Sequence, residues 1–223
     1  MIKHLIFDFD GVIVDSEILA AEAFANALLD MKIRSTYSTG FIAEKFAGNK
    51  MVKVASEICE IHNIEDKNAY LKKAMEFVSE SYNTKLKTVE GIEKLLKLNI
   101  FDLYICSNSG NQRIIKGLKN VGLDSFFNNN RIYTFEMVKN PKPSPDIFLK
   151  TVEDNNLDKK EVLVLEDSVP GVQAAVTAGL KVVGVTVASH WKGRSSKVLI
   201  ESGAIAVLKS YLDFKDLLKT IQN

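Results

Sequence analysis

The sequence predicts an α/β protein: a Rossmann-like parallel sheet core with an inserted all-helical cap domain. Short apolar runs alternate with helical patterns from about residue 90 almost to the end of the chain. Such alternation specifies βαβ units and therefore a parallel sheet covered on both faces. A separate apolar run opens the chain, and the long stretch that follows it shows helical periodicity without a convincing strand.

The N-terminal elements follow from the spacing of apolar residues. Residues 5–9 form a short apolar run that stops at Gly11, which indicates a buried strand and then a turn. Polar residues recur every fourth position between 17 and 31, which predicts a helix with one face toward water. Further helices are expected from just after Gly48 to Ile58 and over about 68–82.

Strands and helices alternate in the remainder of the chain. Strands are expected at 103–106, 132–134, 162–165 and 182–185, with a weaker one at 204–208. Helices are expected at 92–98, 111–121, 144–155 and 169–178. The predicted domains are therefore an α/β core of residues 1–15 and 87–223 and a helical cap of residues 16–86.

Composition narrows the class of partner. The chain has 29 Lys and Arg residues against 28 Asp and Glu residues, a balance that gives no reason to expect nucleic acid or an acidic membrane. The two cysteines and three histidines are scattered, unlike a disulfide framework or a zinc site. No signal core or membrane span is recognisable, and no obligatory protein partner is evident. We expect a cytoplasmic protein, for which small anionic substrates remain possible because a single pocket can be basic while the total charge is balanced.

Residues that could react with a ligand or bind it, through a side chain or a backbone amide, follow each of the first four predicted strands. They are Asp8, Asp10, Gly11 and Val12 after the first strand, Ser107 and Asn108 after the second, Lys142 beyond the third, and Glu166 and Asp167 after the fourth. Ligands of open parallel sheets bind at the carboxyl ends of the strands. Taken singly, each of these motifs also fits an ordinary turn, the start of a helix or a surface lysine. Their common position at one edge of the predicted sheet favours a ligand-binding site.

Four acidic groups at one edge need a counter-charge. Asp8 and Asp10 lie two residues apart and so face the same side of an extended strand. Like charges ~4 Å apart repel by about 4 kcal/mol at an effective dielectric near 20. A divalent cation together with Lys142 would cancel three of the four charges, and Mg²⁺ prefers such oxygen ligands and bridges to phosphates.

The same residues are suited to phosphoryl transfer. The side chains of Asp8 and Asp167 and the backbone carbonyl of Asp10 are the predicted Mg²⁺ ligands, with Glu166 behind them or as a further ligand. The carboxylate of Asp10 would then be free to donate and accept a proton. Lys142 and the metal would neutralise an incoming phosphate. Its oxygens would be held by Ser107, Asn108 and the amides of Gly11 and Val12.

Four segments resemble the haloacid dehalogenase superfamily, in the branch with a helical cap after the first strand. They are DFDGVIVDS at 8–16, ICSNS at 105–109, KPSPDIF at 142–148 and LEDSVPG at 165–171. The resemblance covers nearly the whole chain. It implies a covalent aspartyl-phosphate on Asp8, with Asp10 as the acid and then the base, and Lys142 orienting Asp8. Asp10 itself argues against carbon–halogen and carbon–phosphorus cleavage.

The cap is expected to select the substrate. Hinges would lie near residues 14–15 and 87–90, and Gly48, Asn49 and Lys50 fall in the loop that resembles the family's specificity loop. That loop looks most like those of bacterial sugar-phosphate phosphatases. Relatives similar to β-phosphoglucomutase carry a cap histidine and an arginine where this chain has Ala20 and Met51.

The predicted function is therefore a Mg²⁺-dependent phosphatase, a phosphoric monoester hydrolase, acting on a small sugar or sugar-acid phosphate. Two alternatives remain at this point. A phosphomutase of the β-phosphoglucomutase type would share the core motifs, but the two cap departures disfavour it. A non-catalytic binder of phosphorylated metabolites would keep the fold, although it would have no need of Asp8, Asp10 and Lys142.

Overall fold

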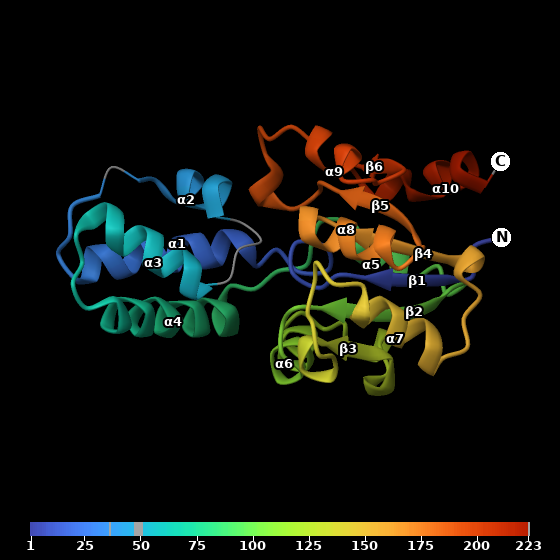
Figure 1. Cartoon of the computed structure of the whole chain (residues 1–223), viewed down its shortest axis with the longest axis horizontal. Helices are drawn as coiled ribbons and strands as arrows, with labels where there is room; N and C mark the ends of the chain where they lie inside the picture. The colour runs from blue at the N-terminus through green and yellow to red at the C-terminus, as the bar shows by residue number, and fades with distance from the viewer. Residues whose placement is uncertain (36, 47–50, 223) are drawn as a thin grey trace. The chain divides into compact units, whose positions relative to one another are not determined.

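The computed structural model describes residues 1–35, 37–46 and 51–222, and the chain divides into two compact units (Figure 1). The first unit comprises Met1–Val14 and Thr88–Asn223, and the second comprises Asp15–Lys87. The chain leaves and re-enters the first unit at neighbouring points, because Val14 and Thr88 form an antiparallel bridge. The second unit is therefore inserted between these two residues without interrupting the sheet of the first unit.

The first unit is built on a six-stranded parallel sheet in the order β3-β2-β1-β4-β5-β6 (Figure 1). The strands are β1 (His4–Phe7), β2 (Asp102–Ser107), β3 (Ile132–Thr134), β4 (Val162–Glu166), β5 (Lys181–Val185) and β6 (Ala206–Leu208). The predicted α/β fold class is confirmed. Strand β1 lies in the centre, between β2 and β4, so that residues following these three strands are brought together.

Alternate residues of the strands pack on opposite faces of the sheet. Ile6 is in register with Tyr104 and Val164, and all three belong to one buried apolar cluster. That cluster also takes side chains from α7 (Asp146–Asp154), α8 (Val169–Thr177) and α9 (Lys197–Glu201). Phe7 points to the other face, where its ring meets Phe127 at 6.1 Å between centroids.

The remaining helices of this unit are α5 (Ile92–Leu96), α6 (Asn111–Asn120) and α10 (Phe214–Gln222). Each expected strand and helix of the core is present with small shifts at its ends. None of these shifts exceeds two residues. The first strand ends at Phe7 rather than residue 9, and α7 begins at Asp146 because Pro143 and Pro145 precede it. Helices α9 and α10 were not predicted.

The second unit consists of α1 (Glu17–Asp30), α2 (Thr39–Phe46), α3 (Met51–His62) and α4 (Lys67–Thr84). These helices enclose an apolar cluster of their own, drawn from the interior faces of all four. Tyr70 is fully buried in it, and its hydroxyl donates to the carbonyl of Phe24 at 3.0 Å. Across the described residues, none of the helices has the length and apolar character needed to cross a bilayer.

Candidate active site

Two aspartates follow the central strand β1, as the sequence predicts. The amide of Asp8 donates to the carbonyl of Leu165 at 2.9 Å, which extends the β1–β4 pairing by one residue. Asp8 is only 8% exposed. The chain then turns sharply, with the Gly11 amide donating to the carbonyl of Val14 at 2.8 Å. This turn leaves Asp10 at the edge of the site, partly exposed.

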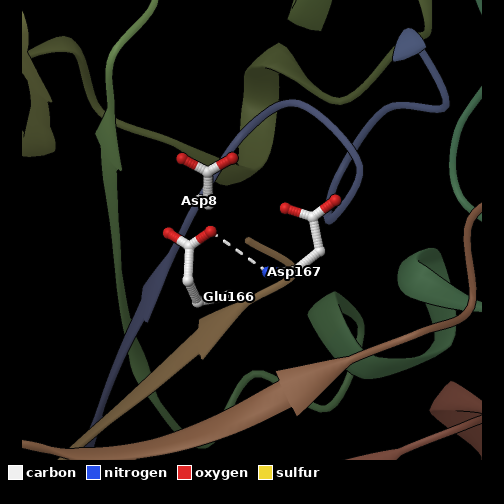
Figure 2. A group of neighbouring side chains, drawn as sticks. All are labelled: Asp8, Glu166 and Asp167. Carbon is white, nitrogen blue, oxygen red and sulfur yellow. Dashed lines mark hydrogen bonds between the residues drawn. The ribbon is translucent and has the colours of Figure 1, made fainter. Parts of the chain in front are cut away.

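Glu166 is the last residue of the neighbouring strand β4 and Asp167 follows it, and their carboxyl groups face that of Asp8 (Figure 2). One oxygen from each of the three carboxyl groups lies within 4.8 Å of the others. Glu166 is fully buried. Its Oε1 accepts from the amides of Asp167 and Ser168 at 3.1 and 3.0 Å and from Ser168 Oγ at 2.8 Å. Glu166 is thus held rigidly in its place by the start of α8.

The side chain of Lys142 enters this acidic group from the loop after β3. Its Nζ donates to Asp8 Oδ1 at 2.7 Å, to Glu166 Oε2 at 2.6 Å and to the carbonyl of Cys106 at 2.7 Å. The backbone of Lys142 is fixed by Asn108, whose side-chain Nδ2 donates to the Lys142 carbonyl and whose Oδ1 accepts from the Lys142 amide, both at 3.0 Å. The three contacts of Nζ use all three hydrogen-bond donors of the ammonium group.

The site carries more negative than positive charge. Lys142 balances only one of the three buried carboxylates. Burial and the Glu166 carboxylate raise the pKa of Asp8 and of Asp167 well above the usual range, and Lys142 offsets this only in part. Burial alone would lower the pKa of Lys142, but Asp8 and Glu166 together raise it above its usual value. An added cation would relieve the repulsion.

Asp10 is held by two side chains that sequence reasoning missed. Ser109 Oγ donates to Asp10 Oδ2, and Arg113 Nη2 donates to Asp10 Oδ1 at 2.9 Å. Ser109 follows β2, and Arg113 lies in the first turn of α6. Ser109 belongs to one of the four sequence motifs, whereas Arg113 resembles any polar residue on an amphipathic helix. No sequence signal distinguishes it.

The predicted phosphate-binding residues lie at the same edge. Ser107 is buried, and its Oγ accepts from the amide of Ser109 at 3.1 Å. The side chain of Asn108 is engaged with Lys142, as described above. The Gly11 amide already donates a hydrogen bond to the carbonyl of Val14 within its turn. The carbonyl of Val12 accepts a hydrogen bond from the Tyr211 hydroxyl at 2.7 Å. Their binding of phosphate stays a prediction.

His190 also reaches the acidic group, from the segment after β5, for which the sequence predicts no role. Its Nε2 lies 3.1 Å from Asp167 Oδ2, and the residue is 6% exposed. Tyr211 comes from near the end of the chain and is buried as well. Burial, and then the charges of Asp167 and Asp8, raise its pKa well above the usual range. Long-range contacts of this kind leave no local sequence signal.

The predicted specificity residues Gly48, Asn49 and Lys50 lie outside the described residues. The structure does describe the two positions at which the chain departs from β-phosphoglucomutase-like relatives. Ala20 lies in α1, and Met51 is the first residue of α3.

The family model for haloacid dehalogenase-like hydrolases matches residues 5–185 of the chain. Among curated proteins, the phosphorylated carbohydrates phosphatase of Thermotoga maritima is 28% identical over 93% of this chain and 94% of its own length. The 6-phosphogluconate phosphatase of Escherichia coli is 23% identical over 81% of each chain. A haloacid dehalogenase-like protein of unknown function from Agrobacterium tumefaciens superposes with a TM-score of 0.90, with 29% identity and 100% of both chains covered.

The chain therefore belongs to the haloacid dehalogenase-like hydrolase family. Its enzyme class within that family is phosphoric monoester hydrolase, that is, a phosphatase.

Proposed function

We propose that this protein is a Mg²⁺-dependent phosphatase that hydrolyses a small phosphorylated sugar or sugar acid through a phosphorylated Asp8. The observation that carries the proposal is the buried group of Asp8, Glu166 and Asp167 around the Nζ of Lys142. It combines a nucleophilic carboxylate, a fixed cation and an excess of negative charge. All of these stand at the edge of the sheet where parallel α/β proteins bind ligands.

The donor set suits Mg²⁺. The side chains of Asp8 and Asp167 and the main-chain carbonyl of Asp10 would hold the ion, since it prefers oxygen ligands. Glu166 already uses Oε1 for three donors and Oε2 for Lys142, so its role is to orient Lys142 and the start of α8. When bound, Mg²⁺ would neutralise negative charge on the phosphate and on the carboxylates.

The reaction would take place in two steps. In the first, an Asp8 carboxylate oxygen bonds to phosphorus, the bond from phosphorus to the sugar oxygen breaks, and Asp10 gives that oxygen its proton. In the second, Asp10 accepts a proton from water, the water oxygen bonds to phosphorus, and the bond to Asp8 breaks. Inorganic phosphate leaves, and both aspartates return to their starting states.

Lys142 and the residues after β2 would hold the phosphate during these steps. Lys142 touches Asp8 at 2.7 Å, so its charge lies beside the reacting oxygen. Ser107 is the last residue of β2, the strand next to β1, and Asn108 follows it; Gly11 and Val12 lie in the turn after β1. Hydrogen-bond donors fixed before the substrate arrives need no reorganisation as charge develops.

The substrate class is supported by the relatives. One is named a phosphatase of phosphorylated carbohydrates and another a 6-phosphogluconate phosphatase. The inserted helical unit Asp15–Lys87 would act as the cap that selects among such compounds, with Gly48, Asn49 and Lys50 contacting the leaving group.

Release of inorganic phosphate from a panel of sugar phosphates, sugar-acid phosphates, glycolytic intermediates and nucleotides tests the proposal. We expect release with Mg²⁺, none with a chelator, and none from Asp8→Asn, while Asp213→Asn, an exposed aspartate far along the chain, retains full activity. Faster turnover of nucleotides than of any sugar phosphate would contradict the substrate class. Accumulation of an isomer in place of phosphate would instead indicate a mutase.

A further inference from the structure

A cavity of about 460 Å³ opens at the same edge of the sheet, beyond the acidic group. None of its lining residues is acidic; they are Thr186, Trp191, Arg194, Ser195, Ser196 and Lys209. Thr186 directly follows β5 and Lys209 directly follows β6, and the Thr186 amide donates to the carbonyl of Leu208 at 3.0 Å. The cavity is called the cationic cavity below.

The two positive charges of the cationic cavity are not neutralised within the protein. Across the described part of the chain, the side chains of Arg194 and Lys209 form no ion pair and no hydrogen bond. Arg194 is nonetheless held in place: its guanidinium carbon lies 4.7 Å from the centre of the Trp191 ring, and its amide donates to the Trp191 carbonyl at 3.0 Å. Two such cations facing one cavity favour an anion between them.

The neutral polar groups of the cavity are the hydroxyls of Thr186, Ser195 and Ser196, each of which can donate a hydrogen bond to an anion. Ser195 Oγ already accepts from the amide of Lys197 at 3.3 Å, which leaves its proton available for donation.

We propose that the cationic cavity is a second anion-binding site, which takes a small molecule bearing a phosphate or carboxylate group. It lies on the segment that also carries His190, whose Nε2 is 3.1 Å from Asp167. An anion bound there would therefore order the segment that contacts the acidic group. The bound anion is either a group of the substrate remote from its reacting phosphate or a separate small anion. In both cases the cavity binds a phosphate or carboxylate group.

The test uses Trp191, which is the only tryptophan in the chain. Its fluorescence is followed while inorganic phosphate replaces chloride at constant ionic strength, so that general screening does not change. We expect a saturable change whose Kd rises at least about tenfold in Arg194→Gln/Lys209→Gln, because two charge-assisted contacts are lost. The control is Lys192→Gln/Lys215→Gln, which removes the same charge from two exposed lysines outside the cavity.

The proposal is overturned if the wild-type protein shows no saturable change, or if both double variants bind phosphate as the wild type does. The second result would assign the signal to phosphate at Asp8. Circular dichroism and the thermal transition confirm that each variant is folded. The single variants Arg194→Gln and Lys209→Gln provide a further measurement, each expected to weaken binding several-fold.

A kinetic comparison then separates the two sources of the anion. It uses a phosphorylated sugar acid, 6-phosphogluconate, and the matching sugar phosphate without a carboxylate, glucose 6-phosphate. If Arg194→Gln/Lys209→Gln raises KM for the sugar acid alone, the carboxylate of the substrate occupies the cavity. If KM changes for neither compound, a free anion is the ligand. This comparison rests on the proposed phosphatase activity, whereas the fluorescence titration does not, so failure of one is distinguishable from failure of the other.

Discussion

At the scale of single residues, the turn behind Asp8 depends on the absence of a side chain at position 11. Gly11 has a φ of 78°, in the left-handed region that other residues adopt with strain. A Cβ at this position would lie 1.9 Å from Asp167 Oδ2. This close approach brings the turn after β1 directly against the end of β4. It therefore sets the distance between Asp8, which follows β1, and the two acidic residues at the end of β4.

Gly11→Ala should therefore abolish most phosphatase activity and most stabilisation by Mg²⁺. Gly122→Ala is the matched control, because Gly122 has a φ of 71° but no atom within 4 Å of its added Cβ. Both changes should lower the free energy of unfolding by about 1–2 kcal/mol through backbone strain. Only Gly11→Ala should displace Asp167. Equal loss of activity in both variants would show that strain rather than crowding matters.

The acidic group also predicts how the metal-free protein responds to pH. The pKa values of Asp8 and Asp167 are raised above their usual value of 3.8 by burial and then by Glu166, so the folded state binds more protons than the unfolded state. Their contribution to stability is present at low pH and is lost as pH rises through the raised pKa values. In chelator, the free energy of unfolding should fall as pH rises above 3.8 and through the raised pKa values, with a limiting slope of about 1.4 kcal/mol per pH unit for each carboxyl.

Urea unfolding at several pH values checks this expectation. Mg²⁺ should flatten the dependence, since bound metal favours the ionised carboxylates. Asp8→Asn should reduce the slope, and Asp213→Asn should leave it unchanged. A free energy of unfolding that rises with pH in chelator would contradict the raised pKa values.

At the scale of elements, α6 contributes to the site although no residue of it belongs to the sequence motifs. Its first turn places Arg113 Nη2 at 2.9 Å from Asp10 Oδ1, while Ser109 donates to the other oxygen. Asp10 is the proposed acid and base, and a misplacement of about 1 Å can slow a reaction about a hundredfold. Arg113 is thus a positioning residue for Asp10.

Arg113→Met should lower kcat by about ten- to a hundredfold and leave KM within about threefold, because binding of the phosphate does not depend on Asp10. Lys116→Met is the control on the same helix, since Lys116 is exposed. Arg113→Lys should restore part of the rate, which a purely structural role would not require. A change confined to KM would assign Arg113 to substrate binding instead.

The elements of the core were predictable because parallel strands are short apolar runs and the helices between them are amphipathic. The same rule predicts that Asp8, Lys142, Glu166 and Asp167 share one edge, and the structure places these four together. Arg113 was missed because its contact with Asp10 spans 103 residues of sequence separation. A polar residue in a first helical turn gives no sign of where its side chain reaches.

At the scale of the whole molecule, the two units have separate apolar cores. One buried cluster draws only on residues of the sheet unit, and the other only on residues between Ala21 and Ala74. Every proposed catalytic residue belongs to the sheet unit. The insertion is therefore expected to govern which substrate is used, while the sheet unit performs the chemistry.

Replacing residues 15–87 with Asn-Gly tests this division. Val14 and Thr88 are antiparallel bridge partners, and two residues of this type close a hairpin between such partners. The shortened chain should unfold in one cooperative transition and remain stabilised by Mg²⁺. Its preference for a sugar phosphate over p-nitrophenyl phosphate, measured as the ratio of kcat/KM values, should fall at least about tenfold, because the proposed contacts of the insertion with the leaving group are removed. A shortened chain that is unfolded would show that the sheet unit depends on the insertion for stability, and an unchanged preference in a folded one would assign substrate selection to the sheet unit.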